Sequence, residues 1–283
     1  MRMKRISLYV LCLIGMASCQ DDSYLGGHYT TDGQGVQANV TAVSASEQTP
    51  AIAWTEGDLI ALTTSYEDSY SRNRFYTCAA DGRTFAAQAG LPVYIKGNGY
   101  LTAYAPVAGT DGAEPIIELN TLHQTAIIDY IFAKEPISPT QADVQLRFRR
   151  VHSRLRATIK TVETEQIRKI VLSGFSHTAS VNPYSWELTL TSAAADLTMT
   201  DEAGIKSFEL KMIPQTVDTA AVVPAQVVLI GTNRSYAIPM GTVTLESDKT
   251  LQMDIDVSSP EPTVAFSADG VTWTDSGKGG NVE

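Results

Sequence analysis

The residues best able to carry out chemistry are three cysteines and four histidines, and their spacing forms no known catalytic or metal-binding motif. No pair of histidines has the close spacing of a zinc-binding helix. The sequence also lacks a Gly-x-Ser-x-Gly nucleophile motif, a phosphate-binding loop ending in Lys-Ser/Thr and a calcium loop of alternating Asp or Asn. The histidines are His28, His123, His152 and His177. We therefore expect no catalytic residue, no metal site and no cofactor.

Two routes to catalysis stay open at this point. Cys78 could act as a nucleophile if a histidine approached it in the fold, although a lone cysteine in a strand-like run is typically a small buried apolar residue. Two carboxylates could also assemble into a glycosidase pair, because their spacing in sequence does not constrain their distance in space.

The first 19 residues have the pattern of a bacterial lipoprotein signal. Three cations precede an apolar run that is too short to span a bilayer, and two small residues then precede a cysteine. These are Arg2, Lys4 and Arg5, the run 6–16, Ala17, Ser18 and Cys19. Met16 stands where such lipoboxes more usually have leucine, and the alternative is an ordinary signal peptide cut beside a chance cysteine. We predict that residues 1–18 are removed and that a diacylglyceryl group on Cys19 anchors the chain to the outer membrane.

Charge and cysteine content limit the possible partners. The 283 residues carry a formal charge of −10, and without residues 1–18, which hold three cations and no acids, the chain would have 18 basic and 31 acidic residues, or −13. Such a chain is poorly suited to nucleic acid, which is bound by clustered cations. Cys12 leaves with the signal and Cys19 carries lipid, so Cys78 has no partner for an intramolecular disulfide.

The remaining sequence has the two-residue period of β-strands. Residues 19–35 are rich in Gly, Asp and Thr and read as a flexible tether. From Val36 apolar and polar residues alternate, and the same period recurs at 208–212 and 251–257. Turn signals at Asp81-Gly82, Gly97-Asn98-Gly99 and Asp269-Gly270 separate the runs. The best helical candidate, 192–199, is short and lacks a cap. We predict an all-β fold of two tandem antiparallel β-sandwich domains.

The proline-containing segment 135–140 marks the expected boundary between these domains. We place the N-terminal sandwich at 36–142 and the C-terminal sandwich at 143–283. Apolar residues change from even to odd positions between Phe148 and Val151, which predicts a bulge or tight turn around Arg149-Arg150. The same stretch holds Arg147, Arg149, Arg150, Arg154, Arg156 and Lys160. This basic run could be a docking face for an acidic partner, a protease-sensitive site, or a solvated strand face that balances neighbouring carboxylates.

Several segments together resemble the Bacteroidetes fimbrillin family, the Mfa-like subunits of type V pili. They are Trp54-x-x-Gly57-Asp58-Leu59-Ile60, residues 100–106 (YLTAYAP), residues 129–133 (DYIFA), Leu146-x-Phe148 with residues 152–155 (HSRL), residues 213–215 (IPQ) and Trp273 near a Gly-rich tail. Residues 20–22 (QDD) also resemble the acidic tag that exports lipoproteins to the cell surface in these bacteria. The resemblance implies two transthyretin-like sandwiches, a surface-exposed lipoprotein of the fimbrium, and joining to other pilus subunits by β-strand complementation.

Two features depart from the pattern that this family implies. In such pilins an arginine-specific protease removes the first strand, for which residues 36–44 are the candidate. Between Arg5 and Arg72 there is no Lys or Arg, so a cut after the first strand falls no earlier than Arg72 or Arg74. The tail 277–283 is too polar and glycine-rich for a donor strand. We therefore expect an accessory subunit, at the tip or anchor, that contributes to adhesion to a host or bacterial surface ligand.

The alternative function is a surface glycan-binding lipoprotein for polysaccharide uptake. The aromatic segments 54–58 and 100–106 could stack on sugars or could fill the sandwich core. An exposed coplanar row of aromatics would favour glycan binding, whereas aromatics buried in both cores would favour the pilus subunit. A secreted glycoside hydrolase is the third possibility, and it requires a pair of carboxylates in a cleft.

Overall fold

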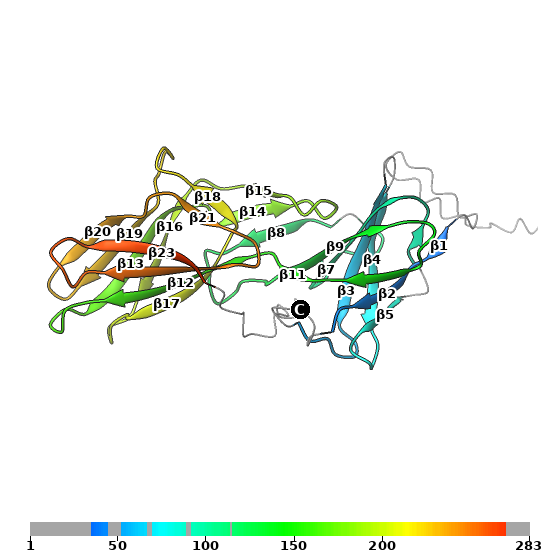
Figure 1. The fold of residues 1–283 in the computed structure, drawn as a ribbon, viewed down its shortest axis with the longest axis horizontal. Coiled ribbons are helices and arrows are strands. Elements are labelled where there is room, and N and C mark those ends of the chain that lie inside the picture. Colours follow the sequence, from blue (N-terminus) through cyan, green and yellow to red (C-terminus); the bar gives the residue numbers. More distant parts are fainter. Residues whose placement is uncertain (1–34, 45–51, 67–69, 89–91, 114, 270–283) are drawn as a thin grey trace, which may run out of the picture. The chain divides into compact units, whose positions relative to one another are not determined.

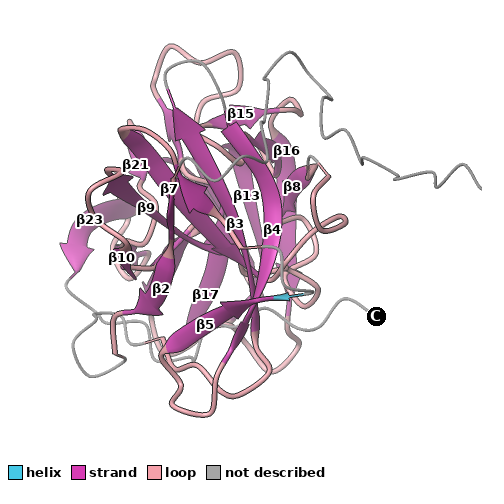
Figure 2. Cartoon of the chain, turned by 90° about the vertical axis from the view of Figure 1, so that its right-hand side faces the viewer, coloured by secondary structure: helices cyan, strands magenta, loops and turns pink. Residues whose placement is uncertain are grey.

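The structure, a computed structural model, describes residues 35–44, 52–66, 70–88, 92–113 and 115–269. Within these ranges the chain forms 23 β-strands and no α-helix, so the prediction of an all-β fold is confirmed (Figures 1 and 2). None of the described residues belongs to a helix long and apolar enough to cross a bilayer. The predicted signal peptide, tether and Cys19 lie outside the described residues.

The first half of the chain builds an eight-stranded sheet in the order β10-β2-β5-β4-β3-β7-β9-β11. Its strands are β2 (Asn39–Ala42), β3 (Leu59–Tyr66), β4 (Tyr70–Cys78), β5 (Thr84–Ala87), β7 (Gly99–Ala105), β9 (Ile131–Ile137), β10 (Asp143–Leu146) and β11 (Arg149–Arg150). The predicted Asp81-Gly82 turn joins β4 to β5, with Gly82 at a φ of 63° that suits glycine. In the same half of the chain, β1 (Val36–Gln37) and β6 (Tyr94–Ile95) form a separate two-stranded antiparallel ladder.

Both faces of the eight-stranded sheet are buried, as β7 illustrates. Leu101, Ala103 and Ala105 point into one apolar cluster, which we call the first core, together with residues of β2, β5 and β10. Tyr104, on the other face, belongs to a separate cluster, the middle core. Strands buried on two faces need near-continuous apolar sequence, which explains the dense runs in this half of the chain.

The second half forms a sandwich of two four-stranded sheets. One has the order β17-β12-β22-β23, from β12 (Ser153–Lys160), β17 (Ser207–Met212), β22 (Thr250–Asp256) and β23 (Thr263–Asp269). The other has the order β16-β13-β19-β20, from β13 (Ile167–Phe175), β16 (Ala195–Thr200), β19 (Gln226–Gly231) and β20 (Ser235–Pro239). Both sheets contribute to one apolar cluster, the second core. A short ladder of β18 (Gln215–Val217) and β21 (Val243–Leu245) completes this half.

The helical candidate at 192–199 is wrong, because residues 195–200 form β16, which pairs with β13. Its side chains alternate across the strand, with Leu197 buried and its two neighbours exposed. A single buried leucine among small polar residues carries too little periodicity to distinguish a helix from an edge strand.

A three-stranded sheet in the order β15-β14-β8 combines segments from both halves of the chain. β8 (Ile117–Asn120) pairs with β14 (Thr178–Val181), which pairs in turn with β15 (Leu188–Leu190). Side chains of β8 and β14 fill the middle core against Ala61 and Tyr104 of the eight-stranded sheet. The middle core therefore couples residues from before and after the expected boundary.

Strands β10 and β11 also follow residue 142 and yet belong to the eight-stranded sheet. β10 pairs in parallel with β2, and β11 pairs with β9. The chain then bends at Val151-His152 and enters β12 of the second sandwich, next to the position where the change of apolar parity predicted a turn. The division at residue 142 and the transthyretin-like topology stay predictions.

The β14–β15 hairpin anchors the middle core through one tryptophan. The Trp186 ring stacks on Phe132 of β9, with centroids 4.9 Å apart and planes 18° apart, and lies 5.6 Å from the Tyr104 ring. Its backbone has a φ of 61°, which is unfavourable for a bulky residue and is tolerated here because the surrounding packing fixes the turn. Beside it, the Pro183 carbonyl accepts a hydrogen bond from the buried Thr102 hydroxyl.

Replacing Trp186 with alanine should lower the free energy of unfolding by about 3–5 kcal/mol, since the change leaves a cavity against Phe132 and Tyr104. Leu190→Ala, on the same hairpin and 43 % exposed, should change stability by less than about 0.5 kcal/mol. Urea unfolding followed by circular dichroism measures both. Equal effects of the two substitutions would show that the hairpin is not held by its tryptophan.

Candidate functional site

The first full strand, β2, occupies a slot between two neighbours. It runs parallel to β10 and antiparallel to β5. The N–H of Asn39 donates to the Ala142 carbonyl at 2.9 Å, and the N–H of Ala42 donates to the Arg83 carbonyl at 2.9 Å. Withdrawal of β2 would leave backbone groups unpaired on both neighbours, which is the geometry that a strand from another chain can fill.

The floor of this slot is an aromatic cluster. Val40 of β2 is buried opposite Phe85 of β5. The Trp54 ring meets Phe85 edge-on, with centroids 5.2 Å apart, and lies 4.9 Å from the Phe148 ring. The apolar residues of β2 therefore close the first core, and the slot has the character of a hydrophobic groove with a strand bound in it.

The basic residues that follow β2 lie inside another strand. Arg72 and Arg74, the first cations after Arg5, are part of β4, whose neighbours in the sheet are β3 and β5. Proteases bind an extended segment with free backbone groups, so a peptide bond within a paired strand must first be released from the sheet.

A loop covers the outer side of β4 beside Arg74. The N–H of Phe75 donates to Asp111 Oδ1 at 3.1 Å, and the N–H of Gly112 donates to the Asn73 carbonyl at 3.1 Å. Arg74 Nη1 lies 4.0 Å from Asp111 Oδ1. The bond between Arg74 and Phe75 is thus held by β3 on one side and by this loop on the other.

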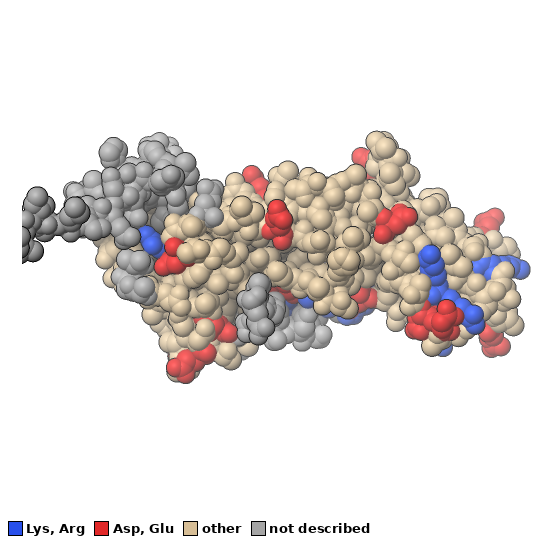
Figure 3. All heavy atoms as spheres, turned by 180° about the vertical axis from the view of Figure 1, so that it is seen from behind, with Lys and Arg blue, Asp and Glu red and all other residues tan. Residues whose placement is uncertain are grey.

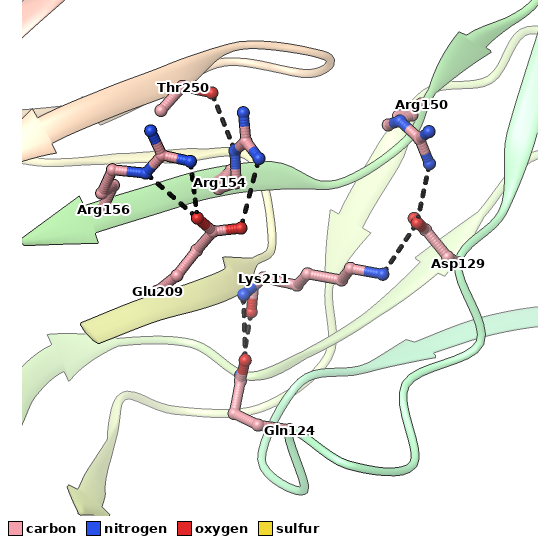
Figure 4. A network of polar contacts seen from close by, with 8 residues as sticks. All are labelled: Gln124, Asp129, Arg150, Arg154, Arg156, Glu209, Lys211 and Thr250. Atoms are coloured by element: carbon pink, nitrogen blue, oxygen red, sulfur yellow. Dashed lines mark hydrogen bonds and ion pairs between the residues drawn. The ribbon is translucent and has the colours of Figure 1, made fainter. Parts of the chain in front are cut away.

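A buried carboxylate connects three segments close to the middle core (Figure 4). Asp129 Oδ2 accepts from Arg150 Nη1 at 2.9 Å and from Lys211 Nζ at 2.8 Å. Asp129 Oδ1 lies 3.3 Å from His152 Nδ1. Asp129, Arg150 and His152 are all buried. Burial opposes ionisation of Asp129, but the hydrogen bonds from His152 and Lys211 and the charge of Lys211 outweigh it, so the pKa of Asp129 lies below its usual value.

Much of the predicted basic run is paired or buried, which argues against a docking face. Arg154 is buried and donates to Thr250 Oγ1 at 3.0 Å and to Glu209 Oε1 at 3.2 Å. Arg156 donates to Glu209 Oε2 through Nε and Nη2 at 3.1 and 2.9 Å (Figure 4). The ion pairs with neighbouring carboxylates agree with the interpretation of this run as a solvated strand face. The burial of Arg150 and Arg154 does not agree with it.

The same region contains a side chain that takes the place of a strand. Gln124 Oε1 accepts from the N–H of Lys211, and Gln124 Nε2 donates to the Lys211 carbonyl, both at 2.9 Å (Figure 4). The amide thereby supplies both hydrogen bonds that a neighbouring strand would make at that residue of β17. The outer edge of β17 is closed at Lys211.

Asp248 contacts this network through Arg150, and its pKa is raised. Burial raises the pKa, although the backbone N–H of Arg150 donates to Asp248 Oδ1 at 3.3 Å. A glycosidase pair needs one carboxyl free to attack or to activate water. Asp129 instead has cations on one oxygen and a histidine on the other, so its arrangement is structural.

The aromatic residues divide between core and surface. Trp54 and Tyr104, from the two segments considered for sugar stacking, are buried. Tyr100 is 48 % exposed, and Lys134 Nζ lies 4.8 Å from its ring centroid. The buried pair favours the pilus subunit by the criterion stated above, and Tyr100 presents one exposed ring beside a cation.

Sequence reasoning found the first strand but missed the polar network. Of the histidines, His152 contacts Asp129. The buried His177 places Nδ1 3.2 Å from Thr121 Oγ1 and Nε2 3.1 Å from the Ala195 carbonyl oxygen. Burial lowers the pKa of His177. The one signal of the network was Asp129 itself, a carboxylate that opens an apolar run. In the part of the chain that the structure describes, no three His, Cys, Asp or Glu residues are grouped to hold a metal ion.

The described surface carries no large field of one sign on the face drawn in Figure 3. Acidic side chains are scattered over that face, and basic ones lie beside acidic ones. Together with the paired cations above, this distribution gives nucleic acid no basic stripe on that face to bind.

Paired β-sheets around apolar cores, with the polar network buried between strands, define a protein of the β-sandwich class. The sequence model of the Fimbrillin-like family matches residues 41–270, so the chain belongs to that family. Membership confirms the resemblance seen in the sequence and makes the chain a fimbrium-associated protein of the cell surface. The family suggests a structural role rather than catalysis.

Solved structures share the fold. A proposed cell adhesion protein of Bacteroides uniformis is 18 % identical, with a TM-score of 0.58, covering 85 % of this chain and 99 % of its own. A proposed cell adhesion protein of Bacteroides ovatus is also 18 % identical with a TM-score of 0.58, covering 82 % of this chain and 95 % of its own. No curated protein matches this chain.

Replacing Asp129 with asparagine should lower the free energy of unfolding by about 3–5 kcal/mol at neutral pH, because Arg150 loses its buried counter-charge. A lowered pKa stabilises the fold above the unfolded value, about 4, and that contribution is lost as the pH falls through the folded value. The difference between wild type and variant should therefore narrow below about pH 4.

The matched control for this prediction is Asp196→Asn, on the exposed edge of β16, which should change stability by less than about 0.5 kcal/mol. Chemical denaturation at several pH values measures all three proteins. A difference between wild type and Asp129→Asn that stays constant down to pH 2 would contradict the role given to the carboxylate.

Proposed function

We propose that this chain is an accessory subunit of a surface fimbrium, placed at the tip or the anchor and held at the outer membrane by lipid on Cys19. The observation that carries the proposal is the position of Arg72 and Arg74 within β4. A basic-specific protease has no residue between β2 and β4 to cut. Of the two residues it could use, Arg74 is paired with Leu62 of β3, and Arg72 lies at the irregularity of the same strand, between the partners Arg74 and Ser71. The first strand then stays in its slot.

Retention of β2 has a direct consequence for assembly by strand complementation. A shaft subunit must vacate its slot so that a neighbour's strand can enter. A subunit whose slot stays filled ends the row of exchanged strands on that side. This supports a terminal position, where the subunit joins other pilus subunits and presents a surface to a host or bacterial ligand.

The acidic composition suits this setting. Many like charges keep a tethered β-sandwich protein soluble and away from a membrane surface that is commonly anionic. Arg154 pairs with Glu209 within the fold, and on the face drawn in Figure 3 the acidic side chains are dispersed rather than gathered in one patch.

A surface glycan-binding lipoprotein is the second candidate, and the observation in its favour is Tyr100. Its exposed ring beside Lys134 could stack on a sugar with an acidic group. One ring offers less area than the row of coplanar aromatics that glycan platforms use, and the buried Trp54 and Tyr104 do not add to it.

Immunogold labelling of intact cells, combined with surface protease shaving, separates the two candidates. We expect gold at one end of filaments and loss of label after shaving. Diffuse labelling without filaments would favour glycan binding, and labelling along the whole shaft would contradict the accessory position. In cells producing Cys19→Ser, palmitate labelling and outer-membrane retention should both be lost, whereas retention of the lipid label would disprove the lipidation site.

A disulfide that locks β2 tests whether the first strand is retained. Asn39 and Asp143 are register partners whose side chains are hydrogen-bonded at 2.9 Å, so Asn39→Cys with Asp143→Cys should cross-link β2 to β10. We expect the locked chain to enter filaments as wild type does. Its absence from SDS-resistant polymers, with Asn39→Cys alone still present there, would show that β2 must leave and that the chain is a shaft subunit.

A further inference from the structure

One end strand of the described sheets lacks the protection that the others have. Natural sheets block their edges against foreign strands with charges and prolines. Among the described sheets of three or more strands, every end strand except β15 contains a charged residue or a proline. β15 has the sequence Leu-Thr-Leu, and the first charged residue after it is Asp196. No described strand pairs with its outer side (Figure 1).

The hydrogen bonds between β15 and β14 show which backbone groups of β15 face outward. The N–H of Thr191 donates to the Thr178 carbonyl, and the Glu187 carbonyl accepts from the N–H of Asn182, both at 3.0 Å. Odd-numbered residues of this segment therefore bond to β14. Even-numbered residues of β15 consequently direct their N–H and C=O groups to the open edge.

The side chains at this edge are apolar on one face. Leu188 and Leu190 point toward the middle core, because their register partners on β14, Val181 and Ala179, belong to that core. Leu188 packs against the core, whereas Leu190 is 43 % exposed. Thr189 is exposed on the outer face. The edge thus combines outward-facing backbone groups with a leucine that is only partly covered.

A second copy of β15 fits this edge in one antiparallel register. Residues that face the edge must pair with residues that face the edge, which places Leu188 of one copy opposite Leu190 of the other. Thr189 then lies opposite its own counterpart. This register pairs all three strand residues of both copies and closes about a two-fold axis. A shift by two residues in either direction would leave part of each strand unpaired.

The charges near the edge permit this pairing. In the two-fold register Glu187 of each copy lies opposite Thr191 of the other. The two glutamates are then four residues apart, about 13 Å along the strands, which exceeds the Debye length at physiological salt. No charged residue occurs between positions 188 and 195. The paired segments therefore repel each other little, although the whole chain is acidic.

We propose that two copies of this chain join along β15 as an antiparallel two-fold pair, in a continuous sheet with three strands from each copy. Each copy would cover Leu190 of the other with its own Leu188. A foreign strand could pair with the same edge, but only an identical strand leaves neither partner with an open edge. The proposal is independent of the terminal position in a fimbrium, because β2 and its slot belong to a different sheet.

Disulfide trapping tests the register. Thr189 would face its counterpart in a non-hydrogen-bonded pair, where Cβ atoms lie close enough for a disulfide. After mild oxidation of the cells that make the protein, Thr189→Cys should give disulfide-linked dimers at about ten times the yield of Thr198→Cys, an exposed position on the end strand β16. The native Cys78 is buried and common to both variants. Equal yields on non-reducing gels would refute the register.

Removal of one outward N–H tests the hydrogen bonding. Leu190→Pro deletes an N–H that faces the open edge and leaves the bonds to β14 in place. Sedimentation velocity of the purified protein at rising concentration should show dimers for wild type and for Leu190→Val, which keeps the N–H, but only monomers for Leu190→Pro. Urea unfolding of the two variants checks that the hairpin itself is intact.

Salt separates this pairing from a contact made by charges. Both copies are acidic, so screening should strengthen the dimer as the salt concentration rises. Three results would overturn the proposal: dimers that weaken with salt, wild-type protein that is monomeric at every concentration, and Leu190→Pro that dimerises as wild type does. Capture of another pilus subunit at β15 without self-association would also overturn it, and would assign the edge to a foreign strand.

Discussion

The buried charge of Asp129 is the constraint on which the arrangement of the strands depends. A carboxylate removed from water must be matched by cations and hydrogen-bond donors, and these come from Arg150 on β11, from the bend at His152 and from Lys211 on β17. Each donor is distant from Asp129 in sequence. The hydrogen bonds to Asp129 therefore fix the point at which the chain leaves the eight-stranded sheet and the position of β17. Apolar packing in the middle core could tolerate small shifts, whereas the three polar contacts tolerate few.

Edge protection is the second principle of the fold. The protein closes exposed backbone by three different means, each visible in the described residues. Parallel pairing with β10 covers one side of β2, a loop carrying Asp111 covers β4, and the amide of Gln124 covers β17. A protein that joins others through β-strands needs most of its strand edges blocked, so that only the intended edge can pair with another chain. In this protein β2, β4 and β17 are each covered by contacts within the same chain.

The sequence predicts local features of this fold well and long-range ones poorly. Alternation of apolar residues identified the strands and the all-β class, and Asp81-Gly82 identified a hairpin, because both signals lie within a few neighbouring residues. Nothing local indicates that β8 pairs with β14 or that β10 returns to β2, since parallel and crossover pairings depend on which partner the whole fold brings near. The Asp129 network escaped notice for the same reason: its donors follow it by 21, 23 and 82 residues.

The pairing of β2 with β10 also determines when the first core can close during folding. Asn39 and its partner Asp143 are 104 residues apart in sequence, and the contacts between β12 and β22 span 96 residues. Contacts this distant pay a large loop-closure entropy before they return any stabilisation, which places such chains among the slow folders of the millisecond-to-second range. Until residue 143 is available, β2 has an apolar face and one empty side, and it resembles a free strand more than a finished one. A nascent chain in that state is the form most open to capture by a foreign strand or by a chaperone.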